Sequence, residues 1–248
     1  SPMSGTYTVG VGGNFTTLTA AVNAYNAGCI AGPIVFSLID NTYPSETFPI
    51  IINSNAYASS TNTLTIKPAT GKTPAITGSS TIALIKLNGA DYVTIDGSNT
   101  AGGTTKNLTF TNTSTDASTS TIIWLASVAA GNGAINNTIK NCNFIGNAST
   151  TTYASVISSG ATVGNVAEAA NSNNTYQNNK FTKAQNAIAL VGPSGNETGN
   201  IITGNTIGAS SPAADKLGYS VDQFPSKTTF LVGCFGIKYN ENKDTVMH

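Results

Sequence analysis

The sequence contains no arginine, and only 9% of its 248 residues are charged. Eleven lysines balance eleven acidic residues, so the formal net charge at pH 7 is zero. A protein without a basic field does not attract phosphates strongly, and we therefore expect no nucleic-acid partner. No apolar run approaches the roughly 20 residues that a membrane-spanning helix needs, so we expect no membrane span either.

Cysteine and histidine are scarce as well. Cys29, Cys142 and Cys234 are widely spaced and odd in number, which fits neither a zinc site nor a disulfide framework. We expect all three to be small buried apolar residues, with one disulfide as the alternative. His248 is the only histidine, so Ser/His/Asp and Cys/His catalysis are not indicated.

Short polar residues take the place of the missing charges. The chain has 37 Thr, 29 Asn, 25 Gly and 24 Ser, while 40% of its residues are hydrophobic. That apolar fraction is enough for a sizeable core in one domain. A surface built from Thr, Asn and Ser rather than Lys, Glu and Arg is not typical of a helix-rich fold.

One helix is predicted, close to the N-terminus, because apolar residues recur there at helical spacing. These residues are Phe15, Leu18, Val22 and Tyr25. Asn14 or Thr16 can cap the start of this helix, and Gly28 can end it.

From residue 33 onward the pattern changes to short β runs without amphipathic helices between them. The runs are IVFSLI, FPIIIN, TLTIK, ALIKL, YVTID, NLTF, TIIWLA, SVIS, AIALV and TFLV. Because helical crossovers are missing, a doubly wound sheet is excluded, which leaves an antiparallel sandwich, a barrel or a solenoid.

Internal repetition favours the solenoid. NNTIKNCNFIG from Asn136 aligns without gaps with NNTYQNNKFTK from Asn173, GNIITGNTIG from Gly199 is a third copy, and KNLTFTNTS from Lys106 is a looser fourth. The copies are irregularly spaced, which the coils of a β-helix tolerate because insertions leave through loops.

Stacked coils place like residues over like, with strands about 4.8 Å apart. The alignment therefore predicts that Ile139 lies over Tyr176 and Phe144 over Phe181 inside the stack. The turns are expected to form a column of amides, with Asn141, Cys142 and Asn143 opposite Asn178, Asn179 and Asn205. The glycines expected to relax the backbone beside it are Gly97, Gly146, Gly204 and Gly208.

Four segments together resemble the pectin-lyase-like right-handed parallel β-helix. They are YTVGVGGNFTTLTAAVNAYNAG, GPIVFSLIDNTYPSE, ADYVTIDGSN and the NNTIKNCNF repeats. The resemblance covers nearly the whole chain and is closest to secreted β-helix proteins that Bacteroidota display on their surface, often through type IX secretion. It implies an all-β solenoid with an N-terminal capping helix and an extracellular location on the bacterial cell surface.

The same resemblance implies the domain organisation. Residues 1–32 would form the N-terminal cap of strand plus helix, and residues 33–248 would form the coils. The final IKYNENKDTVMH looks like the start of another coil. We therefore expect the coils to continue in a longer parent chain, whose other domains, or a secretion or surface complex, would be partners.

Catalytic signals are weak. Hydrolases of this fold bring several Asp together, but here the closest pair is Asp91 and Asp96, and Asp96 precedes a glycine as in a turn. Lyases of this fold usually combine carboxylate-held calcium with a basic residue. The chain lacks arginine, and no acidic cluster accompanies Lys140 in the sequence. We assign no catalytic residue, no metal ligand and no cofactor; calcium is not indicated.

Carbohydrate contacts are the remaining possibility for a site. Trp124 and Tyr153 are the aromatic residues best placed to stack on sugar rings, and Lys140 could contact an acidic sugar. An exposed Trp124 would favour a carbohydrate-binding module.

We therefore expect a non-catalytic extracellular β-helix module, structural or adhesive, of a larger bacterial cell-surface protein. Loops around residues 146–172 and 183–198 would carry recognition. Two alternatives stay open: a polysaccharide lyase or glycoside hydrolase, the lyase being the more expected enzyme, and a carbohydrate-binding module without turnover. A groove lined by two or more carboxylates and a lysine would favour the enzyme, and a flat Thr/Asn face the adhesin.

Overall fold

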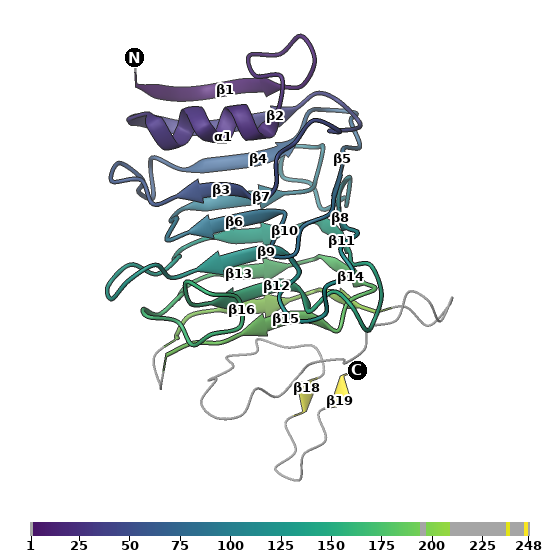
Figure 1. Ribbon diagram of the computed structural model, residues 1–248. Helices are drawn as coiled ribbons and strands as arrows, with labels where there is room; N and C mark the ends of the chain where they lie inside the picture. Colours follow the sequence, from purple (N-terminus) through teal and green to yellow (C-terminus); the bar gives the residue numbers. More distant parts are fainter. Residues whose placement is uncertain (1, 194–196, 209–236, 239–245, 248) are drawn as a thin grey trace.

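The computed structural model describes residues 2–193, 197–208, 237–238 and 246–247. Its strands wind into coils that stack along one axis, as Figure 1 shows. The coils contribute strands to three parallel sheets, one of seven strands and two of five. Crossovers between parallel strands are right-handed. The expected all-β, right-handed parallel β-helix is confirmed.

The three sheets are named A, B and C here. Sheet A contains β1 (Met3–Val9), β2 (Ile30–Leu38), β4 (Leu64–Pro68), β7 (Val93–Asp96), β10 (Thr138–Lys140), β13 (Thr175–Gln177) and β16 (Ile201–Thr203). Sheet B contains β5 (Ala75–Gly78), β8 (Leu108–Asn112), β11 (Cys142–Ile145), β14 (Lys180–Thr182) and β17 (Thr206–Ile207). Sheet C contains β3 (Ile50–Asn53), β6 (Ile85–Asn88), β9 (Thr121–Ala126), β12 (Ala154–Ser159) and β15 (Asn186–Leu190).

The last described strands, β18 (Ile237–Lys238) and β19 (Val246–Met247), pair antiparallel. Residues 209–236, 239–245 and 248 lie outside the described residues. The expectation that the coils run on to residue 248 and beyond therefore stays a prediction. Among the described residues, the structure contains no helix long and apolar enough to cross a membrane.

The core consists of inward-facing columns in the register that the repeats predicted. Ile139 pairs with Tyr176 in sheet A, and Phe144 pairs with Phe181 in sheet B. The looser copy also aligns, because Phe110 pairs with Phe144. The three phenylalanine rings stack at centroid distances of 5.7 and 5.4 Å, with 13° between the planes of each pair. All three are fully buried, and burial alternates along β8 and β11 on either side of this column.

Buried asparagines tie successive coils together at the turns. The Oδ1 atom of Asn174 accepts the backbone N–H of Asn137 at 2.9 Å, and Oδ1 of Asn200 accepts that of Asn174 at 2.8 Å. A second column repeats the pattern. Oδ1 of Asn179 accepts the backbone N–H of Cys142, and the backbone N–H of Asn179 donates to Oδ1 of Asn205. The predicted amide column is confirmed except for Asn143, which lies on the outer face of β11 opposite Lys180. Most of the hydrogen bonds in the column run from side chain to backbone.

The glycines at these turns do not all serve the expected purpose. Gly204 and Gly208 have positive φ values of 63° and 74°, as expected. Gly97 and Gly146 are needed for close approach instead. A Cβ on Gly97 would lie 1.9 Å from the carbonyl oxygen of Asn141, so only glycine fits under the next coil.

The N-terminal cap is β1 followed by α1 (Leu18–Ala27), which close the top of the stack in Figure 1. The helix is capped by Thr17, whose side chain accepts the N–H of Ala20, and not by Asn14 or Thr16. Asn14 instead accepts two bonds from Thr8 and closes the turn before the helix. Gly28 ends the helix as predicted.

Phe15 is the other difference from the predicted helix. It precedes α1 and packs against Tyr7 and Phe36 of the first two strands. The helical face that is buried consists of Leu18, Ala21, Val22 and Tyr25. An apolar residue just before the cap thus belongs to the sheet layer and not to the helix.

The cysteine prediction is half right. Cys142 is buried in the core, and burial raises the pKa of its thiol well above the usual value, so it is an inert packing residue. Cys29 is exposed, because it lies in the link between α1 and β2, outside the core. Both thiols are free, and Cys234 lies outside the described residues.

Phe144→Ala should lower the free energy of unfolding by about 3–5 kcal/mol, because the ring is stacked on both sides and its loss leaves a cavity. Ile145→Ala on the outer face of the same strand should cost only about 1 kcal/mol. Chemical denaturation of both variants checks this. Equal losses would show that Phe144 does not anchor the interior.

Asn174→Ala should lower the free energy of unfolding by about 2–4 kcal/mol. It leaves the N–H of Asn137 and the carbonyls of Ala134 and Asn171 without these hydrogen-bond partners. Asn165→Ala, at an exposed loop position, is the matched control and should change stability by no more than about 0.5 kcal/mol. Both values come from urea melts. A mild effect of Asn174→Ala would contradict the role of the amide column.

Candidate functional site

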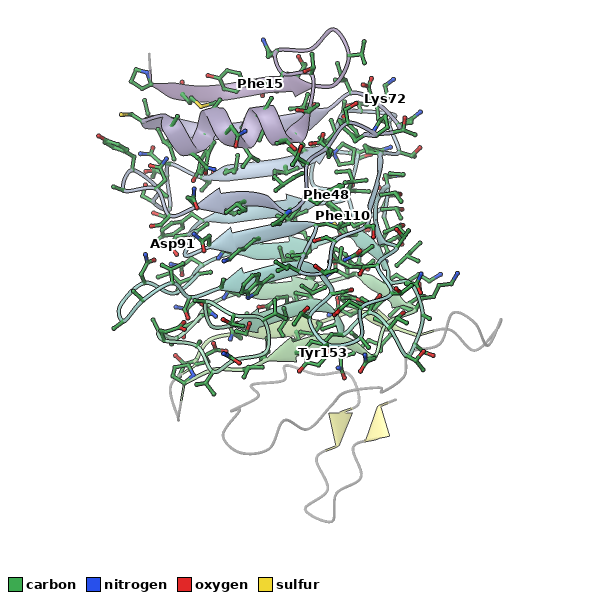
Figure 2. The ribbon with its side chains drawn as sticks, viewed as in Figure 1. Phe15, Phe48, Lys72, Asp91, Phe110 and Tyr153 are labelled. Carbon is green, nitrogen blue, oxygen red and sulfur yellow. The ribbon has the colours of Figure 1, made fainter. Side chains whose placement is uncertain are left out.

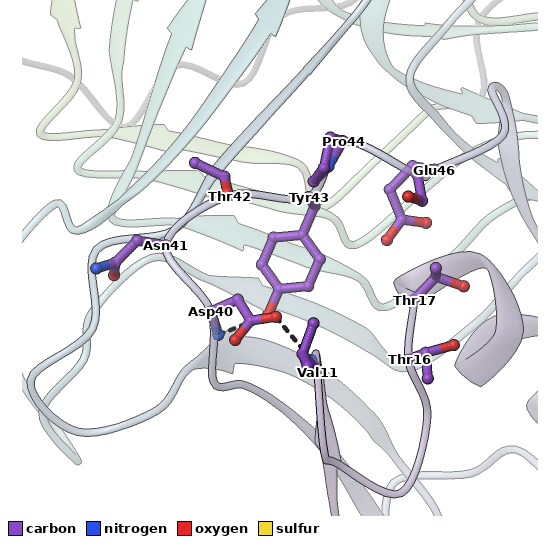
Figure 3. Close-up of a pocket in the computed structure, with 10 residues that line it drawn as sticks. Val11, Thr16, Thr17, Asp40, Asn41, Thr42, Tyr43, Pro44 and Glu46 are labelled. Carbon is purple, nitrogen blue, oxygen red and sulfur yellow. Dashed lines mark hydrogen bonds between the residues drawn. The ribbon is translucent and has the colours of Figure 1, made fainter.

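A pocket at the N-terminal end of the β-helix brings two carboxylates together. It has a volume of about 360 Å³ and lies between the turn before α1 and residues 40–46. Figure 3 shows Asp40 and Glu46 on its wall, with the side chain of Tyr43, from the same segment, between them. No lysine lines it, so it does not match the combination expected for a lyase.

Both carboxylates in this pocket hold backbone groups. Asp40 accepts the N–H of Val11 at 2.7 Å, and Glu46 accepts those of Leu18 and Thr19 at 2.6 and 2.7 Å. Glu46 thereby satisfies the free N–H groups at the start of α1. The Tyr43 hydroxyl donates to the carbonyl of Val9, and burial raises the pKa of this tyrosine to about 12. The pocket is a structural junction.

The same use of carboxylates extends to every Asp and Glu that the structure describes, since each accepts at least one backbone N–H. The acceptors are Asp40, Glu46, Asp91, Asp96, Asp116, Glu168 and Glu197. Among the described residues, no group of three or more His, Cys, Asp or Glu is placed to hold a metal ion.

Lys140 is 32% exposed and forms an ion pair with Asp96, whose Oδ2 lies 3.4 Å from its ammonium nitrogen. The pairing links strands from neighbouring coils, which is why no acid stands near Lys140 in the sequence. Asp96 also accepts from the N–H of Ser98 and from the side chain of Asn141. This confirms its predicted turn role, and Lys140 is therefore partnered by a structural aspartate.

Trp124 is not the exposed platform that a carbohydrate-binding module would need, because its side chain is only 4% exposed. It points to the outer face of sheet C, where its indole N–H donates to Ser159 Oγ at 3.0 Å. The ammonium of Lys86 lies 4.0 Å from its ring centroid. Val163 packs into the same apolar cluster. The exposure of Trp124 that would favour a carbohydrate-binding module is therefore not found, since a second apolar layer covers the sheet there.

The segment that forms this outer layer comprises residues 160–168, called the cover loop here. Its Glu168 accepts from Ser127 Oγ at 2.6 Å and from the N–H of Ala161, and the bond from Ser127 lowers the pKa of this carboxyl. Ala167 donates to the carbonyl of Val191. Tyr153, which precedes β12 and is labelled in Figure 2, is partly buried against the same cluster. Only part of its ring can meet a ligand.

The outer face of sheet B carries a groove of a different kind. Its volume is about 420 Å³. Its lining consists of Thr109, Asn143, Phe144, Ile145, Lys180, Thr182 and Lys183. The lining thus contains hydroxyl, amide and ammonium groups, and no carboxylate lines the groove.

The groove follows from the same alternation that buries the phenylalanine column. Thr109, Asn143 and Lys180 are register partners on successive coils, each one residue before an inward phenylalanine. The repeats predict which residues point inward, but Lys180 and Lys183 on the outer face were not among the predicted site residues. The signal was present in NNKFTK, where two lysines flank the buried Phe181.

Comparisons with known proteins add little to this geometry. Scans against models of protein families and against curated proteins find no match. Among solved structures, the pectin methylesterase from Aspergillus niger in deglycosylated form is 14% identical, with a TM-score of 0.41. The match covers 92% of this chain and 93% of that one. A penultimately deglycosylated form of the same enzyme is 15% identical at the same TM-score. Likeness at this level does not bear on the chemistry of this chain.

Acrylamide should quench the fluorescence of Trp124, the single tryptophan, far less in the native protein than in the unfolded chain, because the cover loop shields it. Val163→Ser should increase the quenching by loosening the apolar cluster. Val166→Ser, at a 60% exposed position of the same loop, should leave it unchanged. Equal quenching of the native and unfolded chains would show that Trp124 is accessible.

Proposed function

We propose that this chain is a non-catalytic, adhesive β-helix module of a larger bacterial cell-surface protein, and that the groove of sheet B is its contact face for glycans. The proposal rests on the described carboxylates, each of which holds a backbone N–H and is thereby committed to structure. The groove offers contact groups without a reacting pair. Such a face can hold a ligand without turning it over.

The chemistry of the groove favours an acidic glycan. Lys180 and Lys183 supply positive charge, and Thr109 and Asn143 supply hydroxyl and amide groups that suit sugar hydroxyls. The repeat of about 4.8 Å between coils presents these groups in a row, which fits an extended polymer better than a single sugar. Exposed charges contribute little singly, so attachment would depend on many weak contacts at once.

The proposed location is the bacterial cell surface. The resemblance of the opening segment and of the Asn-rich repeats to secreted β-helix proteins of Bacteroidota, often type IX secretion substrates, supports it. Other domains of a longer parent chain, or a secretion complex, would then be partners. The loops around 146–172 and 183–198 remain candidate recognition elements so far as they are described, although the cover loop packs on its own sheet.

A polysaccharide lyase or a glycoside hydrolase is the competing function. The test is incubation with acidic and neutral polysaccharides, with and without calcium, followed by mass spectrometry of released oligosaccharides. We expect no products. Unsaturated products would establish a lyase, saturated products would establish a hydrolase, and either result would overturn the proposal.

Retention on immobilised acidic glycans should fall about tenfold when Lys180 and Lys183 are both replaced by alanine, because two charges of the groove are lost. Lys67→Ala with Lys72→Ala removes the same charge away from the groove and is the control. Retention should also fall with added salt. If the groove variant and the control bind as well as the parent protein, the groove is not the contact face.

A further inference from the structure

The interior of the last described coils holds a carboxylic acid that no cation accompanies. Glu197 follows β15 and is 6% exposed. Its Oε1 accepts the N–H of Asn171 at 3.1 Å, whereas Oε2 is buried and has no hydrogen-bond partner among the described residues. Half of this carboxyl group is therefore unsatisfied as long as it is ionised.

Two more unsatisfied oxygens lie beside it. The hydroxyls of Ser158 in β12 and Tyr176 in β13 are buried and likewise lack partners among the described residues. The Ser158 hydroxyl is next to both the carboxyl of Glu197 and the hydroxyl of Tyr176. Three coils thus contribute one unpartnered oxygen each to one interior cluster. The two hydroxyls carry one O–H donor each, and a proton on the carboxyl would add a third donor to the cluster.

The surroundings of Glu197 contain no positive charge. In the described part of the chain, Tyr176 of β13 is the one titratable group that faces it, and the charge of Glu197 adds to the burial that raises the pKa of this tyrosine. Ser158 and the backbone of Asn171 supply neutral polar groups, and Gly192 packs against the side-chain carbons. Among the described residues, no ion pair offsets the loss of water around the carboxylate of Glu197.

Asn171 connects this cluster to the rest of the stack. Its side chain donates to the carbonyl of Ser159 and accepts from the N–H of Ala134. Its backbone carbonyl accepts from the side-chain amides of Asn174 and Asn200. The protonation state of Glu197 therefore affects Asn171, which is hydrogen-bonded to four neighbouring segments.

We propose that Glu197 is a pH-sensitive switch of the β-helix: protonated, it completes the interior cluster with Ser158 and Tyr176, and ionised, it loosens the coils that Asn171 joins. The switch regulates the rigidity of this end of the module and does not depend on the sheet B groove. It is set by burial of the carboxyl without a cation beside it among the described residues.

The direction of the pH dependence follows from the folded state. Burial raises the pKa of Glu197 to about 7, and the polar contacts with Asn171 and Ser158 offset only part of that rise. In the unfolded chain the pKa is about 4.3. The folded state thus binds the extra proton between these two values. The stabilisation that this proton gives the folded state is fully present below about pH 4.3. It declines as the pH rises from there through about 7, and it is lost above that.

The proton itself can be followed by carbon-13 NMR of the chain labelled at its glutamate carboxyl carbons. The labelled residues are Glu46, Glu168, Glu197 and Glu241. One resonance should titrate near neutral pH, and that resonance should be missing in Glu197→Gln. Titration of all four carboxyls below about pH 5.5 would overturn the switch.

The coupling to stability can be read from thermal melts between about pH 5 and pH 8.5. The parent protein should lose about 5 °C or more of melting temperature over this range relative to Glu197→Gln, whose interior amide does not titrate. Glu168→Gln is the control and should keep the slope of the parent protein, because the pKa of Glu168 is lowered and not raised. Parallel slopes for the parent protein and Glu197→Gln would contradict the proposal.

If Glu197→Gln does not fold, hydrogen exchange of the parent protein gives the same answer. After correction for intrinsic rates, the amides of Asn137, Asn171 and Asn174 should exchange at least several-fold faster above neutral pH than at pH 5, whereas the amide of Ile66 in β4 should not change. Uniform protection at both pH values would overturn the proposal.

Discussion

Vertical stacking of equivalent residues is the constraint on which the rest of this structure depends. In a parallel β-helix each side chain has the corresponding side chain of the next coil as its neighbour, so a charged column would repel itself. An asparagine can accept from one coil while donating to carbonyls around it, as Asn174 does between Asn137 and Asn200. The absence of arginine and the abundance of Asn and Thr are consequences of this rule.

The same rule shapes what the chain can do chemically. Carboxylates are rare, and the described ones lie at caps, turns and coil junctions where a backbone N–H is available to each. Each of them supplies a hydrogen-bond acceptor for a backbone N–H at that place. The two lysines of the sheet B groove are on the outside, where solvent weakens their repulsion, and this is the face on which a module of this kind can present charge to a ligand.

Glu197 differs from the other described carboxyls because it lies inside the stack. An ionised group there has lost its water without gaining a counterion, so it is the place where the fold is most sensitive to pH. Asn171 passes that sensitivity to neighbouring coils through its hydrogen bonds. The inner columns are otherwise apolar or neutral, and their packing does not depend on protonation.

The sequence by itself determined the fold class, the capping helix and the inner columns, because stacking makes equivalent positions alike and the likeness is visible as repeats. Phe144 over Phe181 and Asn179 over Asn205 could be aligned by eye. Which residues are covered or paired on the outer surface became evident only from the three-dimensional structure. Trp124 is covered by a loop that occurs once in the chain, and Lys140 meets Asp96 from another coil. An inserted loop is not part of the repeat, so the repeat does not predict which face of the stack the loop covers. A pair of charges from two coils is distant in the sequence, so no local pattern predicts their contact.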